Sequence, residues 1–169
     1  MTKGVLNMSI EIVKQFFGQY GMADKVMEFD TSSATVELAA QAVGVIPARI
    51  AKTLSFMNKD GNGFLILTAG DAKIDNGKFK GTFHTKAKML TPEEALALTG
   101  HAIGGVCPFG INKDVPVYLD VSLKRFQTVF PACGSSNSAI ELDCEQLFTM
   151  SNGLEWIDVC KDWDASLVG

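Results

Sequence analysis

A lysine and two loops of small residues are the parts of this 169-residue chain best suited to chemistry. Residues 50–56 (IAKTLSF) place Lys52 at the head of an otherwise apolar run. Residues 104–110 (GGVCPFG) combine three glycines with a proline, a composition that lets backbone approach a ligand closely. Residues 133–138 (CGSSNS) form a small polar loop ahead of a strand. Taken alone, the lysine also fits the solvent side of an edge strand, and the loops fit ordinary turns.

The familiar catalytic patterns are absent from the chain. There is no G-x-S-x-G elbow, no H-E-x-x-H, no Walker lysine loop and no G-x-G-x-x-G after a strand. His84 and His101 are too few for most metal sites, and we expect them to lie on the surface or in loops. Cys107 lies within the glycine-rich loop, so a thiol enzyme is one alternative, although no base is evident near it in sequence.

The composition indicates one globular domain spanning residues 1–169. Hydrophobic residues make up 47% of the chain and charged residues 20%, and we find no repeat, low-complexity tract or linker. The first seven residues contain one lysine and no apolar run of signal-peptide length, and no apolar run is long enough to span a membrane. The four cysteines contain no C-x-x-C pair, which favours reduced thiols. We therefore expect a cytoplasmic protein that does not bind membranes.

Charge is unevenly distributed along the chain. The net charge of −4 argues against indiscriminate nucleic-acid binding, and we expect no DNA partner. From residue 141 onward there are seven acids and one lysine. This distribution could present one face to a polyanion, but a solvated lysine-rich helix and loop is the alternative. The residues that could bind tRNA are five lysines in a segment with a single acid: Lys73, Lys78, Lys80, Lys86 and Lys88.

Helices and strands alternate along the sequence. Apolar residues at helical spacing and capping residues predict helices over 9–20, 35–43, 91–100 and 122–130, a short helix at Pro47 and another helix starting between Asp143 and Gln146. Runs prone to form strands cover 53–57, 64–69, 115–121, 139–142 and 156–160. The turn-rich residues 59–63 join the first two strands into a hairpin. The hairpin favours a mixed sheet over a purely parallel one, in a single α/β domain.

The order of these motifs resembles one known family. Ala-Lys-Thr-Leu at 51–54, Ala-Gly-Asp at 69–71, Thr-Gly at 99–100, the glycine-rich loop 104–110 and a small-residue loop ahead of Ile-Glu-Leu at 140–142 follow one another. This order is similar to that of the YbaK family, the prolyl-tRNA synthetase-associated editing domains, which occur free-standing or inserted in the synthetase. The resemblance spans residues 30–150, and the lysine strand and the glycine-rich loop are its most specific parts.

The resemblance implies a compact mixed α+β fold with a barrel-like β-sheet surrounded by helices. It implies hydrolysis of the ester that joins a mischarged amino acid to the 3′ end of tRNA, with no metal and no organic cofactor. It also implies positions for the site. The family's pocket lysine falls on Lys52, and its glycine-rich wall falls on Gly104, Gly105 and Pro108. On this resemblance we expect Lys52, Gly104 and Gly105 to act in catalysis. We expect Pro108 and Gly110 to bind substrate, together with Gly134 and Ser135, which match the later small-residue loop less tightly.

Elementary chemistry fits these positions. Ester hydrolysis passes through a tetrahedral oxyanion, which backbone N–H groups of a glycine loop can stabilise. An aminoacyl ester is already activated and has a neighbouring ribose hydroxyl, so a site that orients substrate and water could suffice. We expect Lys52 to bind the terminal phosphate or the carbonyl oxygen as a compact cation, and not to act as a general base.

The chain departs from the family at positions that affect substrate choice. Some members place an aspartate where this chain has Ala139, and some place a tyrosine where it has Val26 or Phe29. Specificity for cysteine or alanine therefore cannot be carried over, and we expect hydroxyl-bearing residues ahead of the second helix to line the pocket: Thr31, Ser33 and Thr35.

The sequence thus predicts a trans-editing deacylase of Cys- or Ala-tRNA(Pro)-like substrates. Its partners would be the aminoacylated acceptor end of tRNA and prolyl-tRNA synthetase or another synthetase. Two alternatives remain open. One is a non-catalytic module that binds aminoacyl-tRNA, and the other is an esterase on a small acylated metabolite.

Overall fold

The computed structural model describes residues 3–169, with side chains described from residue 8 onward. Residues 1 and 2, part of the segment predicted to lack a signal peptide, lie outside the described residues. Within the described part, no helix is long and apolar enough to cross a membrane. The helices are α1 (Lys3–Gly18), α2 (Val36–Val43), α3 (Asn76–Phe83), α4 (Pro92–Thr99) and α5 (Cys144–Met150), with short 3-10 turns at Ala23–Lys25, Pro47–Arg49 and Val121–Arg125.

Six strands form the central sheet, in the order β8-β6-β2-β3-β5-β9. Their bounds are β2 (Ile50–Met57), β3 (Gly63–Ala69), β5 (Val117–Asp120), β6 (Thr128–Pro131), β8 (Leu142–Asp143) and β9 (Glu155–Ile157). The β2–β3 hairpin is antiparallel, whereas β2–β6, β3–β5 and β5–β9 are parallel, so the sheet is mixed. Two small sheets pair β1 (Met27–Glu28) with β7 (Ser138–Ala139) and β4 (Lys73–Ile74) with β10 (Cys160–Lys161).

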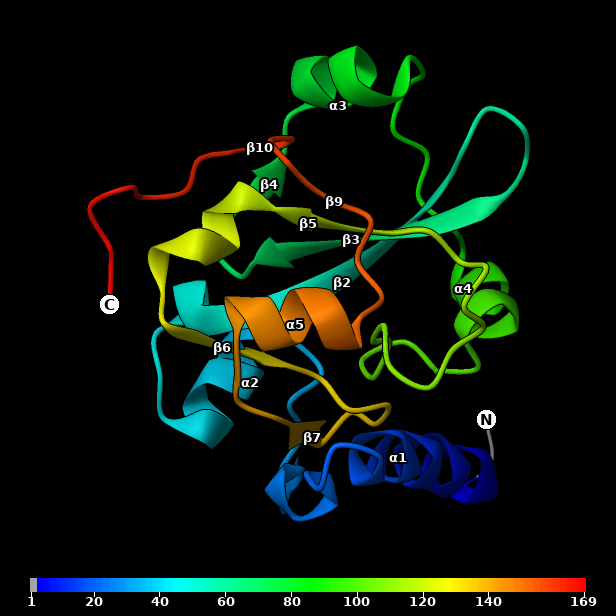
Figure 1. Cartoon of the computed structure of the whole chain (residues 1–169), viewed down its shortest axis with the longest axis vertical. Coiled ribbons are helices and arrows are strands. Elements are labelled where there is room, and N and C mark those ends of the chain that lie inside the picture. Colours follow the sequence, from blue (N-terminus) through cyan, green and yellow to red (C-terminus); the bar gives the residue numbers. More distant parts are fainter. Residues whose placement is uncertain (1–2) are drawn as a thin grey trace.

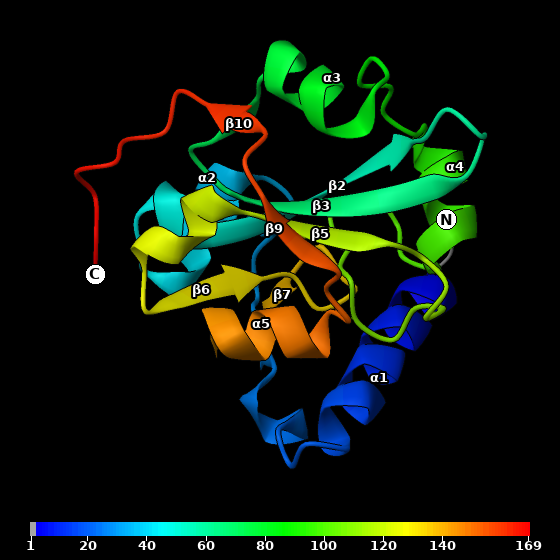
Figure 2. The ribbon, with the colours of Figure 1, turned by 45° about the horizontal axis from the view of Figure 1, so that its top comes forward.

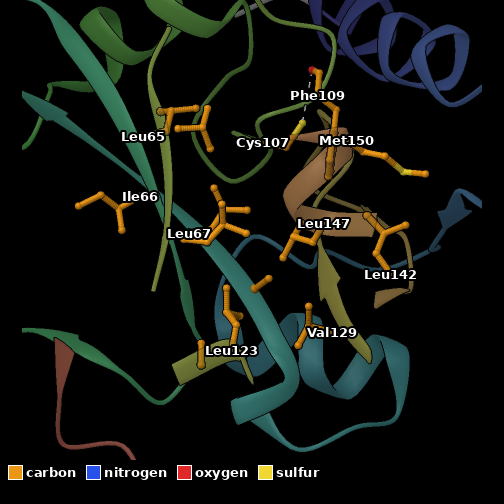
Figure 3. Packing of buried hydrophobic residues seen from close by; sticks show 14 of the residues in the cluster. Leu65, Ile66, Leu67, Cys107, Phe109, Leu123, Val129, Leu142, Leu147 and Met150 are labelled. Carbon is orange, nitrogen blue, oxygen red and sulfur yellow. Dashed lines mark hydrogen bonds between the residues drawn. The ribbon is translucent and has the colours of Figure 1, made fainter. Parts of the chain in front are cut away.

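Helices cover both faces of this sheet. Figures 1 and 2 show α3 on one side of the long β2–β3 hairpin and α1 and α5 on the other. Phe79 of α3 packs on Phe56 and Phe64, with ring centroids 5.1 and 6.2 Å apart. Opposite side chains of the hairpin enter the main core, and Figure 3 shows Leu67 of β3 and Leu147 of α5 pointing toward one another. The predicted α/β fold with a mixed, barrel-like sheet surrounded by helices is confirmed.

Local sequence signals predicted the starts and ends of several helices correctly. Thr35 caps the start of α2, because its side chain accepts a hydrogen bond from the N–H of Leu38 at 3.2 Å, and Gly44, with φ of 85°, ends the helix. Both bonds of the predicted Thr91–Glu94 capping box are present at the start of α4. These ends depend on bonds between near neighbours, which is why the sequence predicts them.

Other element predictions were wrong. The helix expected over 122–130 is a 3-10 turn at Val121–Arg125 followed by strand β6. Thr128, Val129 and Phe130 favour a strand, Pro131 cannot continue a helix, and β6 gains pairing with both β2 and β8. The predicted strands 139–142 and 156–160 each divide between two sheets. The first helix begins before Ser9, whose hydroxyl donates to the Gly100 carbonyl at 2.8 Å and caps nothing.

Candidate functional site

A pocket of about 290 Å³ lies along the outer edge of β2, between α2, α4 and the glycine-rich loop. Its walls are largely apolar, with hydroxyl groups among them. The residues that line it are Ser33, Ala34, Thr35, Val36, Ala39, Ile50, Ala51, Lys52, Thr53, Leu54, Ser55, Met89, Leu90, Pro92, Ala95, Ile103, Gly104, Val106, Phe130, Ala132, Ser138 and Ala139.

Lys52 is the cation in the pocket wall. It lies opposite Thr68 in the β2–β3 hairpin, and its Nζ donates to the carbonyl of Ala72 at 2.6 Å. Burial lowers the pKa of the Lys52 ammonium, while the nearby carboxylate of Asp71 favours the charged form. One hydrogen of the ammonium is engaged by Ala72, which leaves two others to bind a phosphate or carbonyl oxygen.

The two glycines expected to act in catalysis are not equivalent. Gly104 lines the pocket in a left-handed conformation, with φ of 87°, and a Cβ there would lie 3.0 Å from that of Ala34. Gly105 does not line the pocket. Its N–H donates to the carbonyl of Ala102 at 2.9 Å, and a Cβ would lie only 2.6 Å from the backbone nitrogen of Ser135. Gly104 is therefore open to a ligand, whereas Gly105 lets two loops pack together.

The predicted substrate-binding residues divide into two groups. Ser33 and Thr35 line the pocket, although the hydroxyl of Thr35 also caps α2. Among the described residues, the rest are not part of the pocket lining: Thr31, Pro108, Gly110, Gly134 and Ser135.

Three of the residues outside the lining support the loops that form the pocket. Gly134, with φ of 91°, lies against the Ser9 carbonyl of α1, and Gly110 lies against Ile12 of the same helix. Ser135 donates to Ser138 at 2.7 Å, and Ser138 does line the pocket. These residues therefore support the pocket walls by packing against α1 and by bonding to the lining residue Ser138.

The five lysines predicted to bind tRNA have exposed side chains, but they do not form an isolated basic face. Strand β4 pairs with β10, which places Lys73 opposite Lys161, within the acidic C-terminal segment. Lys78 on α3 binds the Asp158 carboxylate and the Cys160 carbonyl, both at 3.0 Å. Segments of opposite charge that are far apart in sequence are therefore neighbours in space. Within residues 8–169, the lysines of this group without an ion pair are Lys73, Lys80, Lys86 and Lys88.

Among the described side chains, no histidine or cysteine lines this pocket. His84 ends α3 in an exposed, left-handed position. His101 lies in a loop, one of the two positions expected, but it is buried, and its Nε2 lies 2.9 Å from the Phe109 carbonyl. Burial raises the pKa of Cys107 to about 12, and its thiol lies 3.9 Å from the same carbonyl, outside the pocket lining. Among residues 3–169, no three His, Cys, Asp or Glu side chains converge on a possible metal site.

Sequence reasoning missed most of the apolar wall. Met89 and Ile103 flank the pocket with 57% and 73% of their surface exposed, and Phe130 forms part of its floor. Ala139, singled out only as a departure from the family, also lines the pocket, so the missing aspartate leaves an uncharged surface there. The exposed apolar residues had no distinguishing spacing in the sequence, since they come from separate loops.

The mixed sheet, and a pocket lined by both Lys52 and Gly104, agree with the resemblance to the YbaK editing domains. The family model for the aminoacyl-tRNA editing domain matches residues 30–150, and the chain belongs to this family. The activity of this family is aminoacyl-tRNA deacylation, a hydrolysis that serves translation fidelity.

Two relatives and one solved structure match at least four fifths of the chain. The "Uncharacterized protein YwhH" of Bacillus subtilis is 59% identical over 157 residues, which are 93% of this chain and 100% of that protein. The "Putative Cys-tRNA(Pro)/Cys-tRNA(Cys) deacylase EbsC" of Enterococcus faecalis is 28% identical over 138 residues, 80% of this chain and 84% of that protein. A crystal structure of "a putative trans-editing enzyme for prolyl tRNA synthetase" superposes with a TM-score of 0.81 at 32% identity, and covers 90% of this chain and 97% of that one.

Proposed function

We propose that this protein hydrolyses the aminoacyl ester of mischarged tRNA in trans, with Cys- or Ala-tRNA(Pro) as the first candidate substrates. The observation that carries the proposal is the pocket itself, because Lys52 and Gly104 both line one largely apolar cavity. A volume of about 290 Å³ suits an aminoacyl group attached to a sugar better than a larger acyl chain. The small, uncharged side chains of the wall favour a small amino acid.

The reaction requires water to attack the ester carbonyl carbon. The bond to the ribose oxygen then breaks, and that oxygen takes up a proton. In our proposal Lys52 binds the terminal phosphate or the carbonyl oxygen, and the backbone at Gly104 faces the oxyanion as charge develops on it. The walls exclude bulk water, which strengthens both interactions. Orientation of an already activated ester accounts for the rate, and no metal takes part.

The tRNA acceptor end would approach from the side of residues 86–90. Met89 and Leu90 line the pocket, and Lys86 and Lys88 lie exposed beside them. Lys78 is engaged by Asp158 and is less available to a phosphate than Lys86 or Lys88. A prolyl-tRNA synthetase or another synthetase would supply the affinity that an acidic chain lacks.

The test is deacylation of a panel of charged tRNAs by the wild-type protein and by Lys52→Met, which keeps an unbranched side chain one atom shorter and removes the charge. We expect selective hydrolysis by the wild type and a loss of at least about 100-fold in kcat/KM in the variant. Treatment with EDTA should leave the wild-type rate unchanged. A folded wild-type protein that binds charged tRNA without hydrolysing any would support the binding module, and hydrolysis of small esters with indifference to tRNA would support the metabolite esterase.

A further inference from the structure

The outer edge of β2 contains a gap in its backbone hydrogen bonding, and the gap lies in the pocket. In an antiparallel pair, facing residues alternate between pairs that bond to each other and pairs that bond outward. Leu65 of β3 donates its N–H to the Pro116 carbonyl at 2.9 Å, and therefore bonds away from β2. Ser55 lies opposite Leu65, and its carbonyl accepts from the N–H of Leu90 at 3.0 Å. Ser55 thus directs its backbone groups to the outer edge.

Thr53 lies two residues before Ser55 and therefore directs its own N–H and carbonyl to the same edge. Both neighbouring stretches of this edge are covered. Strand β6 pairs with β2 only at Ile50 and Ala51, and the N–H of Met57 donates to the Lys88 carbonyl at 2.8 Å. The pairing of β6 with β2 ends at Pro131, whose carbonyl accepts a hydrogen bond from the N–H of Ile140 at 3.1 Å.

No other described residue fills the gap. The outward N–H and carbonyl of Thr53 have no partner among the backbone groups of residues 3–169 or the side chains of residues 8–169. Its hydroxyl is also buried without a partner. Thr53 lines the pocket together with Leu90 on one side of the gap and Ala132 on the other. A donor and an acceptor of one residue therefore face the cavity, where leaving them unpaired costs free energy.

We propose that the main chain of Thr53 binds the α-amino and carbonyl groups of an aminoacyl ester, as one rung of an antiparallel ladder. The ligand's ammonium would donate to the Thr53 carbonyl, and the N–H of Thr53 would donate to the ester carbonyl oxygen. These are the two bonds that facing residues exchange in an antiparallel sheet. An α-aminoacyl group carries both partners in the spacing of a strand residue. The inference rests on the proposed function and specifies how the substrate is recognised.

Two consequences follow from this binding. Recognition through main chain is independent of the amino-acid side chain, so this contact selects for a free α-amino group and leaves the choice of amino acid to the pocket walls. The N–H of Thr53 also stays on the carbonyl oxygen as that oxygen becomes negative, and so stabilises the oxyanion. It thereby supplies a donor that Gly105 cannot, because the N–H of Gly105 is bonded to Ala102.

The experiment uses nuclear magnetic resonance of the ¹⁵N-labelled full chain with two stable amide probes. The first is 3′-deoxy-3′-(alanylamino)adenosine, and the second is its propionyl counterpart, which lacks the α-amino group. With the first probe bound, we expect the Thr53 amide proton to move downfield and to exchange with solvent at least about tenfold more slowly. The amide of Met57, already bonded on the same edge, is the matched control and should change in neither respect. The propionyl probe should bind at least about tenfold more weakly.

Other outcomes would overturn the inference. Binding of the alanyl probe with shifts at Lys52 and Gly104 but none at Thr53 would do so, as would equal affinity for the two probes or no binding at millimolar concentration. Because these readouts need no turnover, they are separate from the deacylation assay that tests the proposed function.

A variant adds a kinetic test. Thr53→Pro removes the N–H, which makes no bond within the sheet, and proline is tolerated at such edge positions. If its circular dichroism matches that of the wild type, we expect kcat for deacylation to fall about 100-fold. An unchanged kcat in the folded variant would contradict the role of the N–H, and the amide spectrum decides the matter if the variant does not fold.

Discussion

Lys52 carries its charge in a half-buried position, and the resulting loss of hydration lowers the pKa of its ammonium. If the residue binds substrate as a cation, kcat/KM for deacylation should fall as the pH rises through this lowered pKa, below the ordinary value of about 10.4. A pH profile of the deacylation rate, corrected for spontaneous ester hydrolysis, measures the effect. A rate that instead rises through the same range would show that the neutral amine acts as a base.

The same burial makes the charged lysine a cost to folding. Between the lowered pKa of the folded state and the ordinary value, the unfolded chain holds one more proton, so this contribution to the free energy of unfolding rises with pH. Lys52→Met removes both the cost and its pH dependence. Unfolding in urea should therefore find the variant no less stable than the wild type at neutral pH, which separates a loss of activity from a loss of fold.

At the scale of elements, α4 and α5 start with the same kind of capping box, but only α4 contributes residues to the pocket lining. The Thr91–Glu94 box begins α4, which contributes Pro92 and Ala95 to the pocket. Thr91→Ala should lower the free energy of unfolding by about 1 kcal/mol. It should also raise KM for deacylation, because a frayed helix end loosens the pocket wall.

The box at Asp143 and Gln146 provides the matched control. It begins α5, no residue of which lines the pocket. Asp143→Ala should show a similar loss of stability in urea unfolding with KM unchanged. An equal rise of KM in both variants would mean that general stability, and not the wall formed by α4, determines substrate binding.

The elements also show how far sequence reasoning extends. The hairpin was predictable from its turn composition, whereas Lys52 and Gly104 were assigned to the site only through the order of motifs shared with the YbaK family. Strand β6 was mistaken for a helix because its pairing with β2 joins residues about 80 positions apart. The gap at Thr53 was invisible for a related reason. It exists only because β6 leaves the edge at Pro131 and residues 88–90 cover it from the other side.

At the scale of the whole molecule, Arg125 joins segments that are distant in sequence. Its guanidinium binds both carboxylate oxygens of Asp71 and the carbonyl of Asp164. Burial alone would raise the pKa of Asp71, but these bonds to Arg125 hold it below its usual value. The stabilisation is therefore complete above the unfolded-state pKa of about 3.9 and is lost as the pH falls through the lower folded-state pKa. Asp71→Asn should cost about 2 kcal/mol at neutral pH, and the difference from wild type in urea unfolding should vanish in acid.

If Lys86 and Lys88 contact tRNA phosphates as proposed, the deacylation rate should depend on salt concentration. Lys86 and Lys88 lie beside the pocket without an ion pair among the residues whose side chains are described. Replacing both by alanine should reduce the slope of log kcat/KM against log salt concentration by about 1.4, since each phosphate contact at a single strand contributes about 0.7. The exposed pair Lys25 and Lys113, replaced in the same way, should leave the slope unchanged. Equal slopes in all three proteins would exclude residues 86–88 from the docking surface.

Two thiols stand behind the walls of the pocket. Cys107 and Cys133 are fully buried and belong to the two loops that meet at Gly105, and burial raises the pKa of both. An alkylating reagent can reach them only when these loops separate, so the rate of labelling reports how often or how long the two loops are apart. Cys144, half-buried on α5, supplies an internal reference. Mass spectrometry of the labelled chain should show Cys107 and Cys133 protected further by a bound aminoacyl analogue, with Cys144 unaffected. Labelling of the two buried cysteines would thereby report how readily these packed loops separate, and whether a bound ligand holds them together.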